Sequence, residues 1–275
     1  MVIIVGSPLG NWSQGAFLPN KTFYWKISRY YMMKTRFVFV VATAKPEGIE
    51  LPIQKTLARM NTSDFGIETK VCVEYNNKVG LSTVYNKFLD NNPDCDFVVF
   101  LHDDLWLNDV LFFDKVIDAN KANGYDVIGV CGGKKWSLVD AAKPNIWTRA
   151  TSGAGASGFM IHAPTPEFAN ESQSYNGRSY AASNYGFSPS KTLTLDGSIL
   201  IMSKKAIDAG LRFDEQFGFH FYDMDFCITA VKKHKLVVGT APFIATHESL
   251  GQSVAQPEFM EAQKKFVAKW FGGQS

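Results

Sequence analysis

Short apolar segments alternate with amphipathic ones along the first half of this sequence, and this rhythm restricts the possible folds most. Val and Phe dominate the apolar segments, which is typical of strands covered on both faces. The strands predicted in this way are Phe37–Ala42, Thr69–Tyr75, Asp96–Leu101 and Val127–Cys131, and the helices between them lie around Ile53–Met60, Leu81–Leu89 and Val110–Ile117. The alternation predicts an α/β fold with a mostly parallel, doubly wound central sheet flanked by helices, which binds ligands at the carboxyl ends of its strands.

The rhythm breaks over Lys134–Lys191, where Gly, Ser and Asn cluster, and we expect a long functional loop or lid there. Its aromatic side chains could stack on sugar rings or nucleobases, or simply pack the loop. They are Trp136, Trp147, Tyr175, Tyr180, Tyr185 and Phe187. Regular structure is then predicted as strands at Thr192–Met202 and Leu236–Gly239, and as helices at Lys204–Ala209, Asp223–Lys233 and Pro257–Phe271.

A chain of 275 residues is long enough for one large α/β domain, which we place at residues 34–255. Residues 1–33 contain no acidic residue and show no clear periodicity of apolar residues. They are either a peripheral segment or, as we prefer, an upstream extension of a chain that earlier started at Met32 or Met33. Residues 256–275 form a terminal amphipathic helix. We expect it to pack on the domain rather than bind a membrane surface or a polyanion.

Composition excludes some classes of function. The formal net charge is only +2, so no broad electrostatic surface for nucleic acid is predicted. The longest apolar runs fall far below the ~20 residues that span a bilayer, so no transmembrane segment is expected. The four cysteines are scattered without a C-x-x-C pair. We therefore expect free thiols in a soluble, cytoplasmic protein.

Polar residues follow the predicted strand Asp96–Leu101 directly, in the order His102, Asp103 and Asp104. Adjacent carboxylates repel each other, and a bound divalent cation is a common way to relieve that repulsion. The alternative is a pair of helix-capping acids, because Asn108–Asp109 precedes a predicted helix. The segment is therefore a candidate metal or nucleotide site.

Two further segments carry candidate residues. Asp223 and Asp225 open a predicted helix among apolar and aromatic residues. Helix capping explains one acid, whereas a carboxylate in apolar surroundings has a raised pKa and suits a general base. His247 follows an apolar segment; it is either a structural histidine or a ligand for Mn²⁺ or a similar ion.

These features, in this order, resemble glycosyltransferases of the GT-A fold, family 2 type. The likeness is to the bacterial and phage subgroup, whose acidic motif reads His-Asp-Asp rather than Asp-x-Asp. The matching segments, between Arg36 and Gly251, are Phe37–Thr43; Gly80-Leu81-Ser82 with Tyr85-Asn86; Phe100–Leu105; Leu195-Asp196-Gly197 with Phe213-Asp214-Glu215; and Phe219–Phe226 followed by His247–Gly251.

The resemblance implies a GT-A (Rossmann-like) single domain with an acceptor-side loop, and a role for each matching residue. Asp104 and His247 match the metal ligands, and Asp223 matches the catalytic base of inverting members. The positions matching the donor site, where the base, ribose and diphosphate are held, are Thr43, Ala44, Asn76, Asn86, His102 and Asp103; Asp196 lies on its acceptor side.

The sequence thus predicts an inverting glycosyltransferase that uses Mn²⁺ or Mg²⁺. Its donor is a nucleoside-diphosphate sugar, with UDP-sugars favoured, and its acceptor is a hydroxyl group, with a saccharide on a glycan favoured. A phage-type enzyme acting on a hydroxymethylated DNA base is one alternative, which the near-neutral charge disfavours. Others are a non-catalytic nucleotide-sugar-binding protein and a hydrolase that releases nucleotide without an acceptor.

Overall fold

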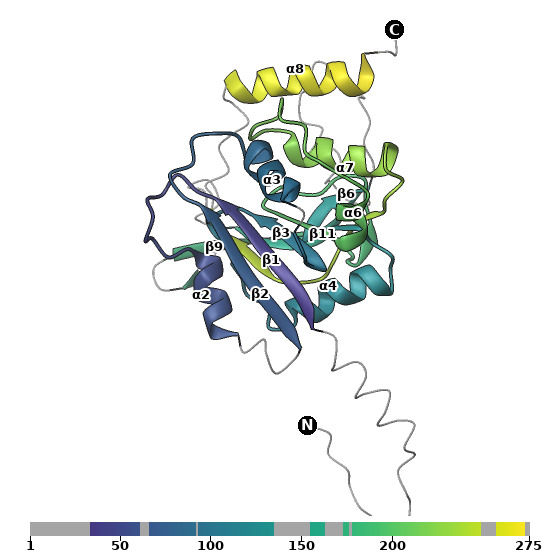
Figure 1. Ribbon diagram of the computed structural model, residues 1–275. Helices are drawn as coiled ribbons and strands as arrows, with labels where there is room; N and C mark the ends of the chain where they lie inside the picture. The colour runs from purple at the N-terminus through teal and green to yellow at the C-terminus, as the bar shows by residue number, and fades with distance from the viewer. Residues whose placement is uncertain are drawn as a thin grey trace, which may run out of the picture. The chain divides into compact units, whose positions relative to one another are not determined.

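The alternating segments form a seven-stranded sheet at the centre of the computed structural model (Figure 1). The structure describes residues 34–60, 66–91, 93–134, 155–162, 173–175, 178–248 and 257–272. The strands, in their order across the sheet, are β10 (Ser190–Lys191), β12 (Val238–Thr240), β5 (Val127–Gly129), β11 (Ile199–Ser203), β3 (Phe97–Leu101), β1 (Thr35–Ala42) and β2 (Ile67–Glu74). All run in one direction except β10 and β11. The predicted α/β fold with a mostly parallel sheet is confirmed.

Alternation along β1 divides the core into two layers, because successive side chains of a strand point to opposite faces. Phe37, Phe39 and Val41 pack with α2 (Pro52–Arg59) and α4 (Phe112–Lys121). The residues between them, from Val38 to Ala42, pack on the opposite face with α3 (Leu81–Asp90), α6 (Lys204–Asp208) and α7 (Tyr222–Lys232). Figure 1 shows these two layers of helices above and below the sheet.

The terminal helix, predicted with the correct bounds, is α8 (Pro257–Phe271). It packs against the α7 side through Phe266, which is fully buried and lies next to Phe217 and Phe221. No helix among the residues that the structure describes is long and apolar enough to cross a membrane. The four cysteines are free, as predicted.

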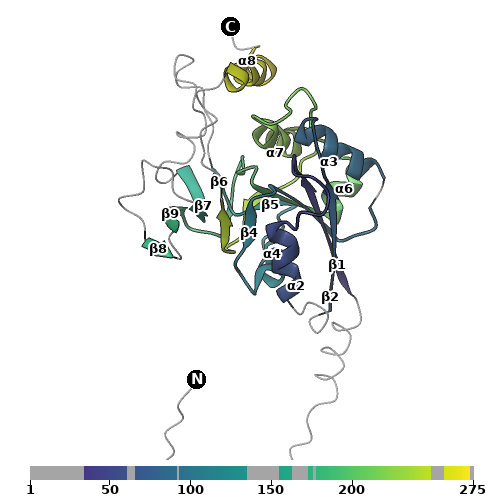
Figure 2. The same ribbon diagram turned by 90° about the vertical axis from the view of Figure 1, so that its left-hand side faces the viewer.

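A second sheet occupies part of the segment that the sequence analysis assigned to a loop (Figure 2). Its strands are β4 (Leu105–Leu107), β13 (Ala245–His247), β7 (Ala156–His162), β9 (Arg178–Gly186) and β8 (Gln173–Tyr175), with β6 (Cys131–Gly133) paired to β7. The prediction that Lys134–Lys191 lacks regular structure is therefore wrong. Within this sheet β7 pairs with β6 and β13, whose distance in sequence hides the pairing from local pattern.

Glycine concealed one of these strands. Gly158 within β7 has φ +107°, and a Cβ atom there would lie 2.1 Å from the carbonyl oxygen of Val130. Only glycine fits so close an approach of two backbones, and a glycine-rich run does not read as a strand. The predicted strand Val127–Cys131 is divided near this close approach into β5 and β6, which belong to different sheets.

Other predicted bounds also differ. The strand predicted at Thr192–Met202 is limited to β11, and Val110, predicted to lie in a helix, precedes α4 with 83% of its surface exposed. Residues 1–33, Trp136 and Trp147 lie outside the described residues, so the predictions about them stay predictions. Three of the remaining candidate aromatics, Tyr180, Tyr185 and Phe187, lie on β9 or just after it.

Candidate active site

Three strands bring the candidate residues to one place. His102–Asp104 follow β3 and lead into β4, and β13 ends at His247, which pairs with Leu105. The backbone N–H of Glu248 donates a hydrogen bond to the carbonyl oxygen of Asp104 at 3.1 Å. Two segments more than 140 positions apart in the sequence are thereby fixed side by side.

Three side-chain atoms converge at this point. His247 Nε2 lies 3.2 Å from His102 Nδ1 and 3.2 Å from Asp104 Oδ1. All three atoms lie within 4.8 Å of one another. Two imidazoles and one carboxylate with converging lone pairs form a donor set that binds transition-metal ions. We call His102, Asp104 and His247 the His-Asp-His cluster.

Tyr222 determines which nitrogen of His102 carries the proton. Its hydroxyl donates to the carbonyl oxygen of Gly197 at 2.6 Å, so the same hydroxyl can only accept from His102 Nε2 at 3.0 Å. A neutral His102 then keeps a free lone pair on Nδ1, the atom that faces the cluster. Such an outer hydrogen bond orients metal-ligating histidines in general.

Asp104 also fits a cation. Its Oδ1 is buried and, among the described residues, lacks a hydrogen-bond partner of good geometry, although His247 Nε2 lies 3.2 Å away, within ion-pair distance. A buried carboxylate oxygen in this state is costly unless a positive charge faces it. The residues present therefore fit a divalent metal ion held by His102 Nδ1, Asp104 Oδ1 and His247 Nε2.

The electrostatics of the cluster suit metal ligation at His102 and Asp104, whereas His247 must give up a proton to ligate an ion. Burial lowers the pKa of His102, and neighbouring His247 lowers it further. Burial alone would raise the pKa of Asp104, but the contact with His247 lowers it below its ordinary value. The pKa of His247 is raised, since its attraction to Asp104 outweighs burial. His102 is thus held neutral beside an ionised carboxylate, as metal ligation requires.

The adjacent acids do not share one site. Asp103 accepts a hydrogen bond from Thr43 Oγ1 and lies 3.2 Å from Lys45 Nζ, whereas Asp104 faces the histidines. Ala44 is exposed beside this pair. Asn76, in the left-handed region with φ 52°, donates its backbone N–H to the carbonyl oxygen of Lys45 at 2.9 Å. Thr43, Ala44, Asn76 and Asp103 are therefore linked at the ends of β1, β2 and β3.

Asn86 is placed differently. Its amide group donates to the carbonyl oxygen of Phe213 at 2.9 Å and to Glu215 at 3.1 Å, and its oxygen accepts from the backbone N–H of Phe213 at 2.9 Å. The side chain is buried and already engaged on both sides of its amide. It holds α3 to the segment before α7, which is a structural role.

Asp223 lies in the first turn of α7, opposite the Asp196–Gly197 turn. Its two oxygens accept hydrogen bonds from the backbone N–H groups of Gly197 at 2.9 Å and Met224 at 2.8 Å. Burial and the negative charge of Asp196 raise the pKa of Asp223 to about 7. A carboxyl group that titrates near neutral pH suits a general acid or base.

The sequence analysis did not select Tyr222, although it lies beside Asp223. A Cβ atom at Gly197 would meet the Tyr222 hydroxyl at 2.5 Å, so the glycine leaves the space that this hydroxyl occupies. Phe219 and His162 were also missed. The ring of Phe219 stacks on His102 at 5.9 Å, and that of His162 lies 6.2 Å from His247. Position within Phe219–Phe226 could have indicated Tyr222 and Phe219; His162 gave no local signal.

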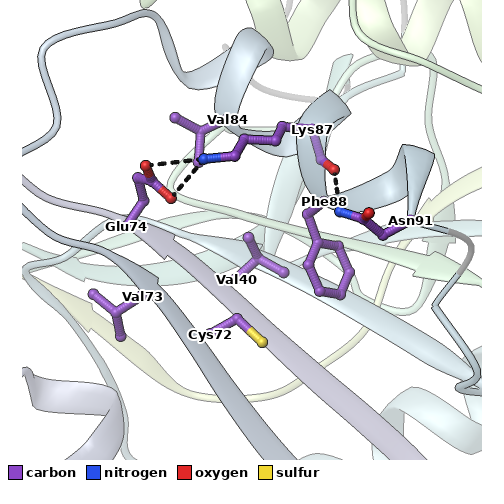
Figure 3. Close-up of a pocket in the computed structure, with 8 residues that line it drawn as sticks. All are labelled: Val40, Cys72, Val73, Glu74, Val84, Lys87, Phe88 and Asn91. Atoms are coloured by element: carbon purple, nitrogen blue, oxygen red, sulfur yellow. Dashed lines mark hydrogen bonds and ion pairs between the residues drawn. The ribbon is translucent and has the colours of Figure 1, made fainter.

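Two of the hollows in the described part of the chain lie outside the cluster. The smaller, about 180 Å³, lies between β1, β2 and α3 (Figure 3). Its walls are largely apolar, and Lys87 closes its rim with an ion pair to Glu74 at 3.2 Å, as the figure shows. The larger, about 730 Å³, lies between residues 216–220 and α8, and Phe219 is part of its wall.

Comparisons with known proteins give the following picture. No protein-family model matches the sequence, and no curated protein matches it. Among solved structures, a mannosyltransferase from Pyrobaculum calidifontis in complex with GDP-Man and Mn²⁺ aligns with TM-score 0.47 and 10% identity, over 85% of this chain and 65% of that one. The inositol-1-phosphate CTP transferase from T. maritima aligns with TM-score 0.33 and 16% identity, over 87% and 82%. Both scores are below 0.5, so neither likeness assigns a function.

Proposed function

We propose that the chain is a metal-dependent glycosyltransferase, which transfers a sugar from a nucleoside-diphosphate sugar to a hydroxyl acceptor with inversion. The observation that carries the proposal is the convergence of His102 Nδ1, Asp104 Oδ1 and His247 Nε2, together with Asp223, whose pKa is raised to about 7 and which follows Tyr222, the partner of His102. One group of residues fits a cation, and the other fits a proton acceptor. Transfer of a sugar from a diphosphate needs both.

The donor set favours Mn²⁺ over Mg²⁺ in this proposal, because Mg²⁺ is bound by oxygen ligands whereas imidazole suits transition metals. When bound, the ion supplies Lewis-acid stabilisation of the leaving diphosphate, worth several kcal/mol. His102 contributes its Nδ1 lone pair only while Tyr222 accepts the proton on Nε2. Tyr222 is therefore a positioning residue in this mechanism.

We assign the donor nucleotide to the edge of the central sheet where β1, β2 and β3 end. The residues there are Thr43, Ala44, Asn76 and Asp103. Asp103 is anchored by Thr43 and Lys45, which leaves it positioned to accept a hydrogen bond from a ribose hydroxyl. UDP is the favoured nucleotide, from the family resemblance. Asn86 is left out of the donor site, because its amide already holds Phe213 and Glu215.

Asp223 is assigned as the base that accepts the proton of the attacking hydroxyl. A positioned general base contributes roughly 10²–10⁴-fold to such a step. The two backbone N–H donors fix the carboxylate, and burial together with the charge of Asp196 keeps its pKa high enough to hold a proton. Attack by the hydroxyl on the side of the sugar opposite the diphosphate gives inversion without a covalent intermediate.

The test is a thermal-shift screen of UDP, dTDP, GDP and CDP, each with and without Mn²⁺. A ligand at about 100 times its Kd adds roughly 2.7 kcal/mol of stability, which is a shift of several degrees. We expect one diphosphate to stabilise the protein only together with Mn²⁺, and EDTA to remove the shift. If none of the four nucleotides shifts the melting temperature, the result contradicts the proposal.

Asp104→Ala is the matching variant, with the exposed Asp114→Ala as its control. We expect Asp104→Ala to abolish the dependence of nucleotide binding on Mn²⁺ and Asp114→Ala to leave it unchanged. If the dependence survives in Asp104→Ala, the metal assignment is wrong.

A further inference from the structure

The larger hollow, between residues 216–220 and α8, shares one residue with the surroundings of the candidate active site: Phe219 lines the hollow and its ring stacks on His102. Phe219 has 56% of its surface exposed, although it stacks almost parallel to His102, with 21° between the ring planes. Because more than half of the Phe219 surface is exposed, burial of the ring contributes little to the stability of the fold. It presents a flat apolar surface to whatever occupies the hollow.

The backbone holds Phe219 in this position under strain. Phe221, two residues later, adopts a left-handed conformation with φ 65°, which is uncommon for a bulky residue. The turn leaves Phe219 exposed while Phe221 is buried against Phe259 and Phe266 of α8. Strain of this kind persists where the surrounding structure fixes a functional geometry.

Backbone packing makes the floor of the hollow rigid. Gly80 and Gly218 approach so closely that a Cβ atom at Gly80 would lie 2.6 Å from the Cα of Gly218. Leu81 N–H donates to the carbonyl oxygen of Gly218 at 2.7 Å, and Ser82 Oγ donates to that of Phe217 at 2.5 Å. The first turn of α3 thus fixes the loop that carries Phe219.

The opposite wall is polar. α8 contributes Glu258, Glu261 and Lys265, and Gln216 adds an amide group from the loop. The carboxylates accept hydrogen bonds from hydroxyl groups, and the amide both accepts and donates them. Two carboxylates repel a phosphate backbone. The volume of about 730 Å³ lies within the range of small-molecule sites, about 300–1,000 Å³.

We propose that this hollow is the acceptor subsite, and that it binds an uncharged pyranose unit stacked on Phe219 with its hydroxyl groups facing Gln216 and the carboxylates of α8. The assignment rests on the proposed function for its role in transfer. It names the acceptor as a saccharide and disfavours DNA. It also gives α8 a direct part in substrate binding.

Saturation-transfer difference NMR with methyl β-D-glucopyranoside, methyl β-D-galactopyranoside and methyl α-D-mannopyranoside tests the subsite, in the absence and in the presence of Mn²⁺ and the stabilising nucleotide. We expect signal from the ring protons of at least one glycoside. Phe219→Ala and Glu261→Gln should each reduce that signal at least about fivefold. Val110→Ala, at a valine that is 83% exposed before α4, should not.

Glu261→Gln serves as the second variant because Phe219 touches His102, so Phe219→Ala alone could act through the cluster. A metal-dependent nucleotide shift that Glu261→Gln retains, combined with a lost glycoside signal, supports the subsite. A glycoside signal equal in Glu261→Gln and Val110→Ala overturns it, as does displacement of the glycoside by a DNA duplex at physiological salt. Glycoside binding without any nucleotide binding keeps the subsite and contradicts the proposed function.

Discussion

The two acids in the first turn of α7 lie two positions apart and have opposite surroundings. At roughly 100° per residue, Asp223 and Asp225 point to opposite sides of the helix. Asp225 is 1% exposed and has Lys269 Nζ and Trp270 Nε1 each 2.7 Å from its Oδ1. Among the described residues, the hydrogen bonds to the Asp223 carboxylate come from backbone N–H groups, and its charged neighbour is another acid, Asp196.

The difference shows that the hydrogen-bond and ion-pair partners of a buried acid decide whether it has a structural or a chemical role. Burial raises the pKa of both acids, but Lys269 and Trp270 oppose that shift at Asp225. The charge of Asp225 therefore fastens α8 to α7 and holds the helix in place. The pKa of Asp223 is about 7, so its proton can move under ordinary conditions.

The largest effect is expected for Asp223→Asn. It should lower turnover at least about 100-fold, because the amide cannot accept the proton, while metal-dependent nucleotide binding stays intact. Steady-state kinetics beside the thermal-shift assay measures both. Asp225→Asn is the comparison and should keep turnover within a few-fold of the parent. Equal losses of turnover in the two variants would contradict the different roles of Asp223 and Asp225.

Lys269→Met tests the structural half of the comparison. It leaves Asp225 buried without its cation, and we expect the free energy of unfolding to fall by about 2 kcal/mol, less than for a fully dry pair because Trp270 remains. Urea denaturation measures this. Lys264→Met on the same helix, where Glu261 lies 4.0 Å from an exposed Lys264, should change stability by less than about 0.5 kcal/mol. No difference between the variants would contradict a fastening role for Asp225.

The smallest expected effect is on pH dependence. With a pKa of about 7, Asp223 is ionised roughly tenfold more at pH 8 than at pH 6, so kcat should rise about tenfold between them. The sign for stability is opposite. The folded pKa exceeds the unfolded value of about 3.9, so the native state binds more protons between about pH 4 and 7 and loses stability as pH rises through that window. Asp223→Asn should lack the fall in Tm across that pH window, whereas a profile unchanged from the parent would remove Asp223 as the titrating group.

Local pattern was enough to predict most of the central sheet. β1, β3, α3, α7 and α8 each have an apolar period that decides the element by itself, and the polar residues after β3 identified one edge as the site. His102, Asp104, Asp223 and His247 were selected from chemistry and from resemblance. Their roles remain proposals, but the structure does bring His102, Asp104 and His247 together.

The sequence by itself determined the strand–helix alternation, because burial on both faces of a strand leaves a local apolar run. Only the tertiary structure decided the second sheet, since β7 pairs with β6, β9 and β13, and its Gly158 is explained by Val130 from a different part of the chain. Tertiary contacts also decided that Asn86 is structural, that Tyr222 fixes the tautomer of His102, and that Asp223 and Asp225 differ. A residue type is local, whereas its partners, burial and pKa depend on contacts between distant segments.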